Sequence, residues 1–212
     1  AKPKDKRVQV IEEIYTTEQN YVYHLFTVID TYLAPLRHNR VPSVRTPKQH
    51  RKSLSFTSIP PSPNLLLNNG GVKVPSLSQT MLERIFSNIE VLAQAHSHFC
   101  DALSDARHKS RAKPANTLFG KVFLDFIPYV KLYELYCSAY ETAIETIKQV
   151  QQTNTQFRDF LKEQCHHPRS DGKDLLSLLI MPIQRVPRYR LLLEELIKHT
   201  SRFHKDRGPL KK

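Results

Sequence analysis

The chain has 212 residues, of which 40% are apolar and 25% charged, and its formal net charge is +12. A chain of this length can bury a core without disulfides or metals, and no apolar run approaches the roughly eighteen residues of a membrane-spanning helix. The charged N-terminus lacks the apolar core of a signal peptide, and three scattered cysteines favour a reducing, intracellular compartment over a disulfide framework. Five glycines are too few for turn-rich β architecture or for glycine-rich phosphate loops.

Residues 7–36 are predicted to form one long amphipathic helix, because their inner seam repeats in alternating steps of three and four. Glu18 interrupts this apolar seam, so its carboxylate must find a hydrogen-bond partner or stay at the edge of the core. Glu12 and Glu13 fall off the seam and are expected to face outward. The seam consists of Val8, Ile11, Tyr15, Glu18, Val22, Leu25, Ile29, Tyr32 and Leu36.

Residues 37–78 are predicted to be a flexible basic insertion. This segment has seven Lys and Arg residues and no acid, so it carries a charge of +7, and it also holds six prolines and seven serines. Such a composition cannot bury enough apolar surface to fold alone. A solvated loop is favoured over contact with an anionic membrane, and both are favoured over nucleic-acid binding. The candidate phosphorylation sites in it are Thr46, Ser53, Ser55 and Ser62.

Residues 79–104 are predicted to form a second helix with Ser78 as its N-cap, followed by a basic loop over 105–116. His96 and His98 are two positions apart in this helix. They cannot share a helix face, so we expect no metal site there.

An aromatic ladder at helical spacing comes next, and a short helix is predicted over 155–165. Stacking of nucleic-acid bases on the ladder is less favoured than burial of its rings in the core of a helical bundle. The ladder consists of Phe119, Phe123, Phe126, Tyr129, Tyr133, Tyr136 and Tyr140.

The last segment, residues 173–200, is a leucine-rich helix interrupted by Pro182 and Pro187, and an interior proline kinks a helix. At about 100° per residue, three polar side chains fall on one line, with Ile180 and Met181 close to it. Such a line with apolar flanks suits either a protein-binding groove or a solvated face. The line consists of Ser177, Gln184 and Arg188.

No enzymatic constellation is found in the sequence. There is no Cys–His pair, carboxylate pair or metal cluster at persuasive spacing, and the adjacent Cys165, His166 and His167 are read as a helix end. We therefore expect no cofactor, no metal and no small-molecule substrate.

Four segments in order resemble the Dbl-homology (RhoGEF) domains, and together they cover nearly the whole chain outside 37–78 and the C-terminus. They are Val10–Leu25, Ile85–Leu92, Phe119–Tyr140 and Asp174–Thr200. The resemblance implies a single Dbl-homology domain over 1–212 with an elongated all-helical bundle. It also implies guanine-nucleotide exchange on a Rho-family GTPase, without covalent chemistry.

The resemblance also assigns residues to the GTPase-binding surface. Glu13 matches the acid that contacts switch I, and Arg188 matches a basic position of the third conserved region. Gln184 and Ser177 match positions that hydrogen-bond toward switch II. Ile180 matches a position that distinguishes GTPases, and an isoleucine there favours a Rac-like partner. Glu18 matches an acid that is usually structural.

The resemblance leaves three expectations and two alternatives. The last helix of family members continues further, so the last helix of this chain is expected to be cut short. A pleckstrin-homology domain, which usually comes next in the family, is not expected in this chain. The 37–78 insertion is expected to be longer than the usual connection. A helical scaffold that binds a Rho-type GTPase without exchange is the main alternative, and a membrane-binding helical module is another. The expected location is cytoplasmic, with peripheral membrane contact through the basic loop.

Overall fold

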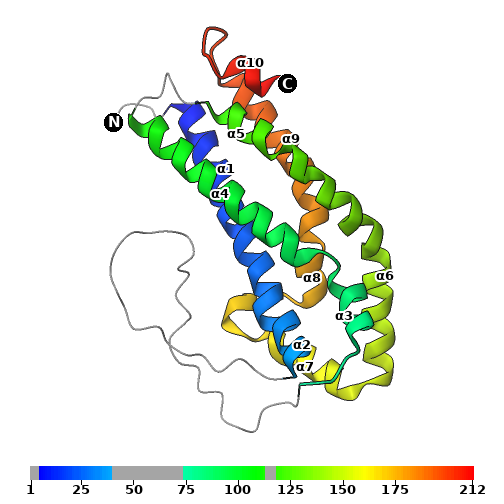
Figure 1. Cartoon of the computed structure of the whole chain (residues 1–212). Helices are drawn as coiled ribbons and strands as arrows, with labels where there is room; N and C mark the ends of the chain where they lie inside the picture. The colour runs from blue at the N-terminus through cyan, green and yellow to red at the C-terminus, as the bar shows by residue number, and fades with distance from the viewer. Residues whose placement is uncertain (1–4, 40–73, 113–117) are drawn as a thin grey trace.

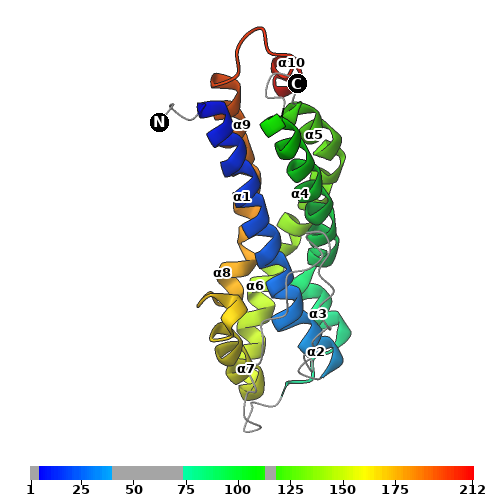
Figure 2. The same ribbon diagram turned by 90° about the vertical axis from the view of Figure 1, so that its left-hand side faces the viewer.

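The computed structural model describes residues 5–39, 74–112 and 118–212. These residues form helices and connecting turns and contain no strand. Figures 1 and 2 show an elongated bundle whose long helices run along its axis. The predicted all-α, elongated bundle is therefore confirmed. Most of the predicted insertion lies outside the described residues, as do Thr46, Ser53, Ser55 and Ser62.

The first predicted helix is one continuous helical segment with a wider turn near its end. Helix α1 (Lys6–Thr27) begins at Asp5, whose carboxylate accepts a backbone N–H at 2.9 Å. A π-helical stretch (Val28–Leu33) leads into α2 (Ala34–His38). Pro35 has no N–H to continue the regular ladder, and a wider π turn is one way for a helix to pass such an irregularity.

The second predicted helix is divided into α3 (Gln79–Phe86) and α4 (Ile89–Ala112). The predicted cap is confirmed, because the Ser78 hydroxyl accepts the backbone N–H of Met81 at 3.2 Å. The break was not predicted. It lies at Ser87, whose φ of 46° is incompatible with a continuing right-handed helix.

Helix α4 is longer than predicted, and the expected loop over 105–116 is wrong as far as residue 112. Ala106 is buried, and the Arg107 guanidinium lies 4.1 Å from the ring centroid of Tyr15. Arg107 also donates to Glu12 at 2.9 Å. These contacts with α1 hold a segment in helical form that its basic composition alone did not favour. They also correct the outward placement of Glu12, which is half-buried.

The aromatic ladder is mostly buried, as predicted, with one exception. It runs through α5 (Phe119–Phe126), a 3₁₀ turn (Ile127–Lys131) and α6 (Leu132–Thr153). Tyr129 is 51% exposed, because the tighter 3₁₀ turn rotates it out of line with the rest. Helix α7 (Thr155–Cys165) has the predicted bounds. Phe119, Phe126, Tyr133 and Tyr136 are buried, and Phe123 and Tyr140 are half-buried.

The predicted kink of the last helix is confirmed at its first proline. Helix α8 (Leu175–Leu179) ends at Ile180, and α9 (Met181–Lys198) starts with Pro182 in its first turn. That position suits proline, because no N–H is needed there. Pro187 lies inside α9, which continues past it.

The chain folds back after α9 and ends in a short helix, α10 (Arg207–Leu210), against α5. The close approach needs Gly120, since a Cβ there would lie 2.7 Å from the backbone N of Leu210. The Asp206 carboxylate accepts from the Gly120 backbone N–H at 2.8 Å and from Arg7 at 2.7 Å. The expectation of a shortened last helix, which rests on the family resemblance, stays a prediction.

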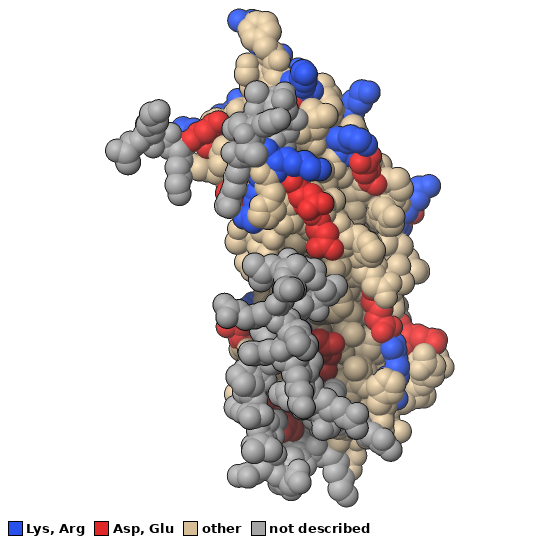
Figure 3. All heavy atoms as spheres, turned by 60° about the vertical axis from the view of Figure 1, so that its left-hand side comes forward, with Lys and Arg blue, Asp and Glu red and all other residues tan. Residues whose placement is uncertain are grey.

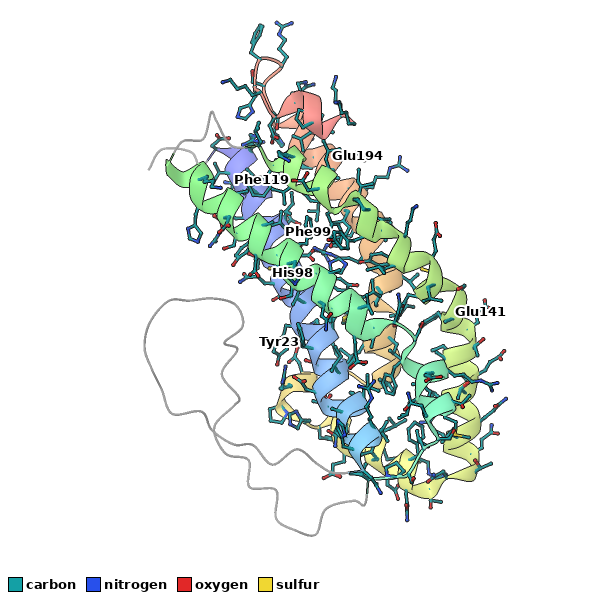
Figure 4. The ribbon with its side chains drawn as sticks, viewed as in Figure 1. Tyr23, His98, Phe99, Phe119, Glu141 and Glu194 are labelled. Carbon is teal, nitrogen blue, oxygen red and sulfur yellow. The ribbon has the colours of Figure 1, made fainter. Side chains whose placement is uncertain are left out.

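Two buried cores lie one above the other along the bundle. The lower one packs the C-terminal half of α1 against α3, α6, α7 and α8, around residues such as Phe86 and Phe160. The upper one packs the N-terminal half of α1 against α4, α5 and α9, around Ile14, Phe99 and Leu196 (Figure 4). Helix α1 contributes to both cores, so the positions of its side chains depend on contacts along the whole bundle.

Candidate functional site

A buried polar cluster lies where α1, α4, α6 and α9 meet. Glu18 has no exposed surface, and its two carboxylate oxygens accept from groups on different helices. Its Oε1 lies 2.7 Å from His96 Nδ1, and its Oε2 lies 2.5 Å from both Arg185 Nη2 and Tyr189 Oη. We call this group the Glu18 cluster, and its members are Glu18, Tyr21, His96, Tyr133, Arg185 and Tyr189.

Two tyrosines complete the Glu18 cluster. Tyr133 Oη lies 2.8 Å from His96 Nε2, and Tyr21 Oη lies 3.2 Å from Tyr133 Oη. The Arg185 guanidinium lies 4.4 Å from the ring centroid of Tyr189, which places the cation against an aromatic face. Every charged member therefore has partners, as a buried charge requires.

The cluster holds a charged acid and a charged base side by side. Burial alone would raise the pKa of Glu18, but the hydrogen bond and charge of His96, with the charge of Arg185, lower it below its ordinary 4.5. Burial would lower the pKa of Arg185, but Glu18 and Tyr189 raise it instead. Burial raises the pKa of Tyr189 well above its ordinary value, so its hydroxyl keeps its proton and donates to Glu18.

This ion pair fixes how α1 and α9 face each other. The two helices run in opposite directions and contact each other along the upper part of the bundle (Figures 1 and 2). Apolar contacts alone tolerate small slides and rotations, whereas a buried carboxylate bound by three groups allows one arrangement. The outer faces of the same two helices are fixed as a consequence.

The predicted site residues of the third conserved region are accessible. Ser177 on α8 and Gln184 and Arg188 on α9 are exposed, and Ile180 at the kink is half-buried. Arg185 points to α1, whereas Val186 lines a hollow against α5. At about 100° per residue, Gln184 and Arg188 lie on the flank of α9 that faces away from Val186.

Glu13 borders the same region from α1. The neighbouring Glu12 marks the flank that faces α4, since it pairs with Arg107, and Tyr21 marks the flank that faces α9, 5.4 Å from Arg185. Helical geometry places Glu13 nearer to the α9 flank, and its side chain is exposed. Glu13, Gln184 and Arg188 therefore lie along one exposed border, which we call the α1–α9 edge.

One exposed apolar residue of this edge was missed from the sequence. Leu191 is 65% exposed and lies one turn beyond Arg188, roughly in line with Gln184. The run of leucines over 191–193 is the signal that could have found it, because three consecutive residues cannot all face the core. The edge thus combines an acid, a base, an amide and an apolar side chain.

The pairing of Glu18 with Arg185 was also missed, although Glu18 was recognised as needing a partner. An acid in one apolar seam and a base in another is the pattern that could have indicated a buried ion pair. His96 belongs to this cluster, where its two ring nitrogens contact Glu18 and Tyr133. No group of His, Cys, Asp and Glu side chains suited to a metal ion occurs within residues 5–39, 74–112 and 118–212.

The other features are structural or apolar. The Cys165 thiol donates to Gly172 O at 3.4 Å, and the His167 side chain accepts from the backbone N–H of Arg169 at 3.2 Å. A hollow of about 180 Å³ between α5, α9 and α10 is lined mainly by apolar residues, including Phe123 and Leu193. No helix in the described part of the chain is long and apolar enough to cross a membrane.

Known proteins resemble this chain over most of its length. Myosin-M heavy chain of Dictyostelium discoideum is 27% identical over 209 residues, which is 99% of this chain and 10% of that protein. Rac guanine nucleotide exchange factor B of the same organism is 29% identical over 228 residues, covering 96% of this chain and 16% of that protein. Proto-oncogene vav of Rattus norvegicus is 38% identical over 121 residues, which is 57% of this chain and 14% of that protein. The chain thus spans only a small part of the length of these relatives.

Solved structures agree with this similarity. A structure of the Vav1 exchange factor with its PH and C1 domains superposes with a TM-score of 0.73 at 28% identity, covering 98% of this chain and 45% of that one. The DH/PH domains of p115-RhoGEF superpose with a TM-score of 0.74 at 22% identity, which supports the fold alone. The family model described as "RhoGEF domain" matches residues 10–212, and this chain belongs to that family.

Proposed function

We propose that this domain is a guanine-nucleotide exchange factor for a Rho-family small GTPase. The α1–α9 edge supports this proposal most directly, because it presents Glu13 and Arg188 in exposed positions beside a rigid buried ion pair. A surface built to deform a partner must itself be rigid. Family membership supports the same activity.

Exchange needs no covalent step and no cofactor in this chain. A domain that binds the nucleotide-free GTPase more tightly than the loaded form must weaken nucleotide binding by the same factor, because binding free energies are reciprocally linked. The domain therefore accelerates GDP release by stabilising the empty state, and GTP then loads.

Each edge residue has a proposed role. Glu13 offers a carboxylate to donors of switch I and draws that segment away from the nucleotide. Arg188 and Gln184, with Ser177 further along, hold switch II in a form that is incompatible with the bound magnesium ion. Leu191 adds apolar contact area next to these polar groups, and a buried apolar contact at an interface strengthens the polar ones around it.

A Rac-like partner is our narrower proposal. Ile180 is the residue that favours it, and its half-buried position at the kink leaves part of the side chain accessible beside Ser177. A relative named as a Rac exchange factor supports the same choice. A solved structure of PDZ-RhoGEF contains RhoA, but at 22% identity it informs the fold alone. We further propose a cytoplasmic location, with membrane contact by the basic 37–78 segment.

The alternative is a scaffold that binds a Rho-type GTPase without promoting exchange. Such a scaffold would keep the bundle but need not keep an exposed acid and base at the α1–α9 edge. Since both are present and exposed, exchange is the stronger proposal.

The test is release of fluorescent GDP from purified Rac-, Rho- and Cdc-type GTPases. The chain is expected to accelerate release from at least one of them, most strongly from Rac. Glu13→Ala and Arg188→Ala are expected to lose this acceleration. Glu141→Ala and Lys148→Ala are their matched controls, because both residues are exposed on α6, where Glu141 lies far from α1 (Figure 4). Tight binding to loaded GTPase without acceleration would support the scaffold instead.

A further inference from the structure

The loop between α9 and α10 presents a large apolar side chain to solvent. Phe203 is 86% exposed, more than any other large apolar residue in the part of the chain that the structure describes. The loop projects from the upper end of the bundle, beyond α5 and α9 (Figures 1 and 2). A single exposed apolar side chain is common on protein surfaces, so its surroundings decide whether it marks a binding surface.

The loop is held firmly at its base. Asp206 is fully buried and paired with Arg7, and it also accepts the Gly120 backbone N–H at 2.8 Å. Arg207 donates to the Ile197 carbonyl at 2.9 Å, and the backbone N–H of His204 donates to the Ser201 carbonyl at 3.0 Å. The exposure of Phe203 is therefore a consequence of a defined turn.

The segment that carries Phe203 also carries exposed cationic side chains. The Arg202 guanidinium lies 5.3 Å from the centroid of the Phe203 ring, and Lys205, Lys211 and Lys212 are exposed. Within the described ranges of the chain, these four cations form no ion pair with an acid. Figure 3 shows Lys and Arg side chains gathered over this end of the molecule.

We propose that this tip, residues 201–212, binds an anionic lipid membrane. Phe203 enters the interface between head groups and acyl chains, and the cations around it contact the anionic head groups. Aromatic side chains favour this interfacial depth, and basic residues near an anionic leaflet are attracted to it. The convex tip fits a flat, charged surface better than an acidic protein, which would need a matching pocket for the ring.

This membrane contact is separate from the α1–α9 edge. The edge runs along the side of the bundle, whereas the tip lies at its end, so a GTPase and a membrane can be bound together. The inference does not depend on exchange activity, because it is measured without a GTPase.

The first test is partitioning of the chain to vesicles of phosphatidylcholine with about 30% phosphatidylserine, against phosphatidylcholine alone, at about 0.1 M salt. A cation near an anionic surface contributes roughly fivefold to partitioning, so Arg202→Gln with Lys205→Gln is expected to weaken binding about 25-fold. Phe203→Ser is expected to weaken it about tenfold. Lys148→Gln with Lys162→Gln removes the same charge from α6 and α7, away from the tip, and is expected to change binding less than about twofold.

The second test uses the absence of tryptophan from the chain. Phe203→Trp introduces a single probe at the tip, and its emission is expected to shift to the blue and to be quenched by brominated lipid in phosphatidylserine vesicles. Leu191→Trp, at another exposed apolar position, should do neither.

Three results would overturn the proposal. One is a Phe203→Trp emission that does not change with vesicles. Another is binding lost only when Arg51 and Lys52 in the 37–78 segment are neutralised. The third is weak binding to vesicles together with strong, Phe203-dependent binding to polyglutamate, which would assign the tip to an acidic protein.

Discussion

Helices α1 and α9 each carry two charged residues that lie close in sequence but in opposite environments. Glu18 and Arg185 are buried against each other, whereas Glu13 and Arg188, five and three residues away, are exposed. The residue types are the same, so the helix face alone separates a structural ion pair from a binding surface. The buried pair fixes the arrangement of the two helices, and this arrangement sets the positions of the exposed Glu13 and Arg188.

The buried and the exposed pair are expected to contribute differently to the free energies of folding and binding. A buried ion pair contributes little net stability, because desolvation of both charges offsets their attraction, but removing one partner leaves the other charge uncompensated. An exposed charge has no such effect on folding, and its loss is felt only when a partner covers it. Variants at the two pairs should therefore change different measured quantities.

The largest effect on folding is expected for Arg185→Met. The substitution leaves the Glu18 carboxylate buried without its cation, which typically costs about 3–5 kcal/mol of the free energy of unfolding. Urea denaturation monitored by circular dichroism measures it. Arg188→Met, the same change three residues away on the exposed flank, is the control and should stay within about 0.5 kcal/mol.

A double variant separates charge from packing at the same place. Glu18→Leu combined with Arg185→Met removes both charges and should recover much of the stability lost in the single variant. Equal loss in the single and double variants would mean that the shape of the cluster matters more than its charge balance.

The next effect is expected on exchange. Arg188→Ala and Glu13→Ala each remove a charged contact at the proposed interface, a change that typically costs about 2–5 kcal/mol, or roughly 30-fold to several thousand-fold in catalysed GDP release. Thermal unfolding should be nearly unchanged in both. Release rates with a saturating and with a limiting amount of GTPase distinguish weakened binding from a slower exchange step.

Two results with these variants would contradict the assignment of Glu13 and Arg188 to a binding surface. If Arg188→Ala unfolds at clearly lower temperature, the residue supports the fold and does not belong to a binding surface. If exchange persists in Glu13→Ala but is lost in Thr16→Ala, another exposed position of α1, the assignment of the acid is wrong while the edge as a whole still stands.

Much of the fold was predictable because its signals are local. Periodic apolar spacing predicted the long helices, Ser78 predicted a cap, and Pro182 predicted the kink. The extension of α4 to Ala112 is accompanied by tertiary contacts such as that of Arg107 with Tyr15, and beside the break at Ser87 the Asn88 side chain donates to the Leu132 carbonyl at 2.9 Å. Such contacts join distant segments and leave no mark in local spacing.

The exposure of the polar residues on α9 could be predicted from the sequence, but the buried ion pair beneath them could not. Helical geometry and the family resemblance placed Gln184 and Arg188 on one exposed flank, and the structure agrees that both are exposed. The support of that flank by Glu18 and Arg185 required the pairing of α1 with α9. Which helices pack together is a property of the tertiary structure, and the apolar spacing within each helix does not determine it.

A smaller effect is expected when the pH is lowered, and it concerns the contribution of buried Glu18 to the free energy of unfolding. Because folding lowers the pKa of Glu18 below 4.5, its contribution to stability is present above that pH and is lost as the pH falls through the lowered value. One such group adds at most about 1.4 kcal/mol per pH unit to the slope of stability against pH. Urea denaturation between about pH 3 and pH 6 should therefore show a shallower slope for Glu18→Gln than for the unchanged chain. Parallel slopes would mean that folding leaves the pKa of Glu18 unchanged, and a steeper slope for Glu18→Gln would mean that Glu18 is protonated in the fold.

The smallest effect is expected for an ion pair that is well formed but exposed. Arg37 donates to both carboxylate oxygens of Glu90 at 2.8 and 2.7 Å, yet both side chains are more than a third exposed. Solvent and salt screen such a pair, so Glu90→Gln should lower the free energy of unfolding by less than about 1 kcal/mol, and by still less at high salt. Glu83→Gln, an exposed acid on the neighbouring helix α3, is the matched control. A loss as large as that of Arg185→Met would show that geometry outweighs burial, which would contradict the distinction between the two environments.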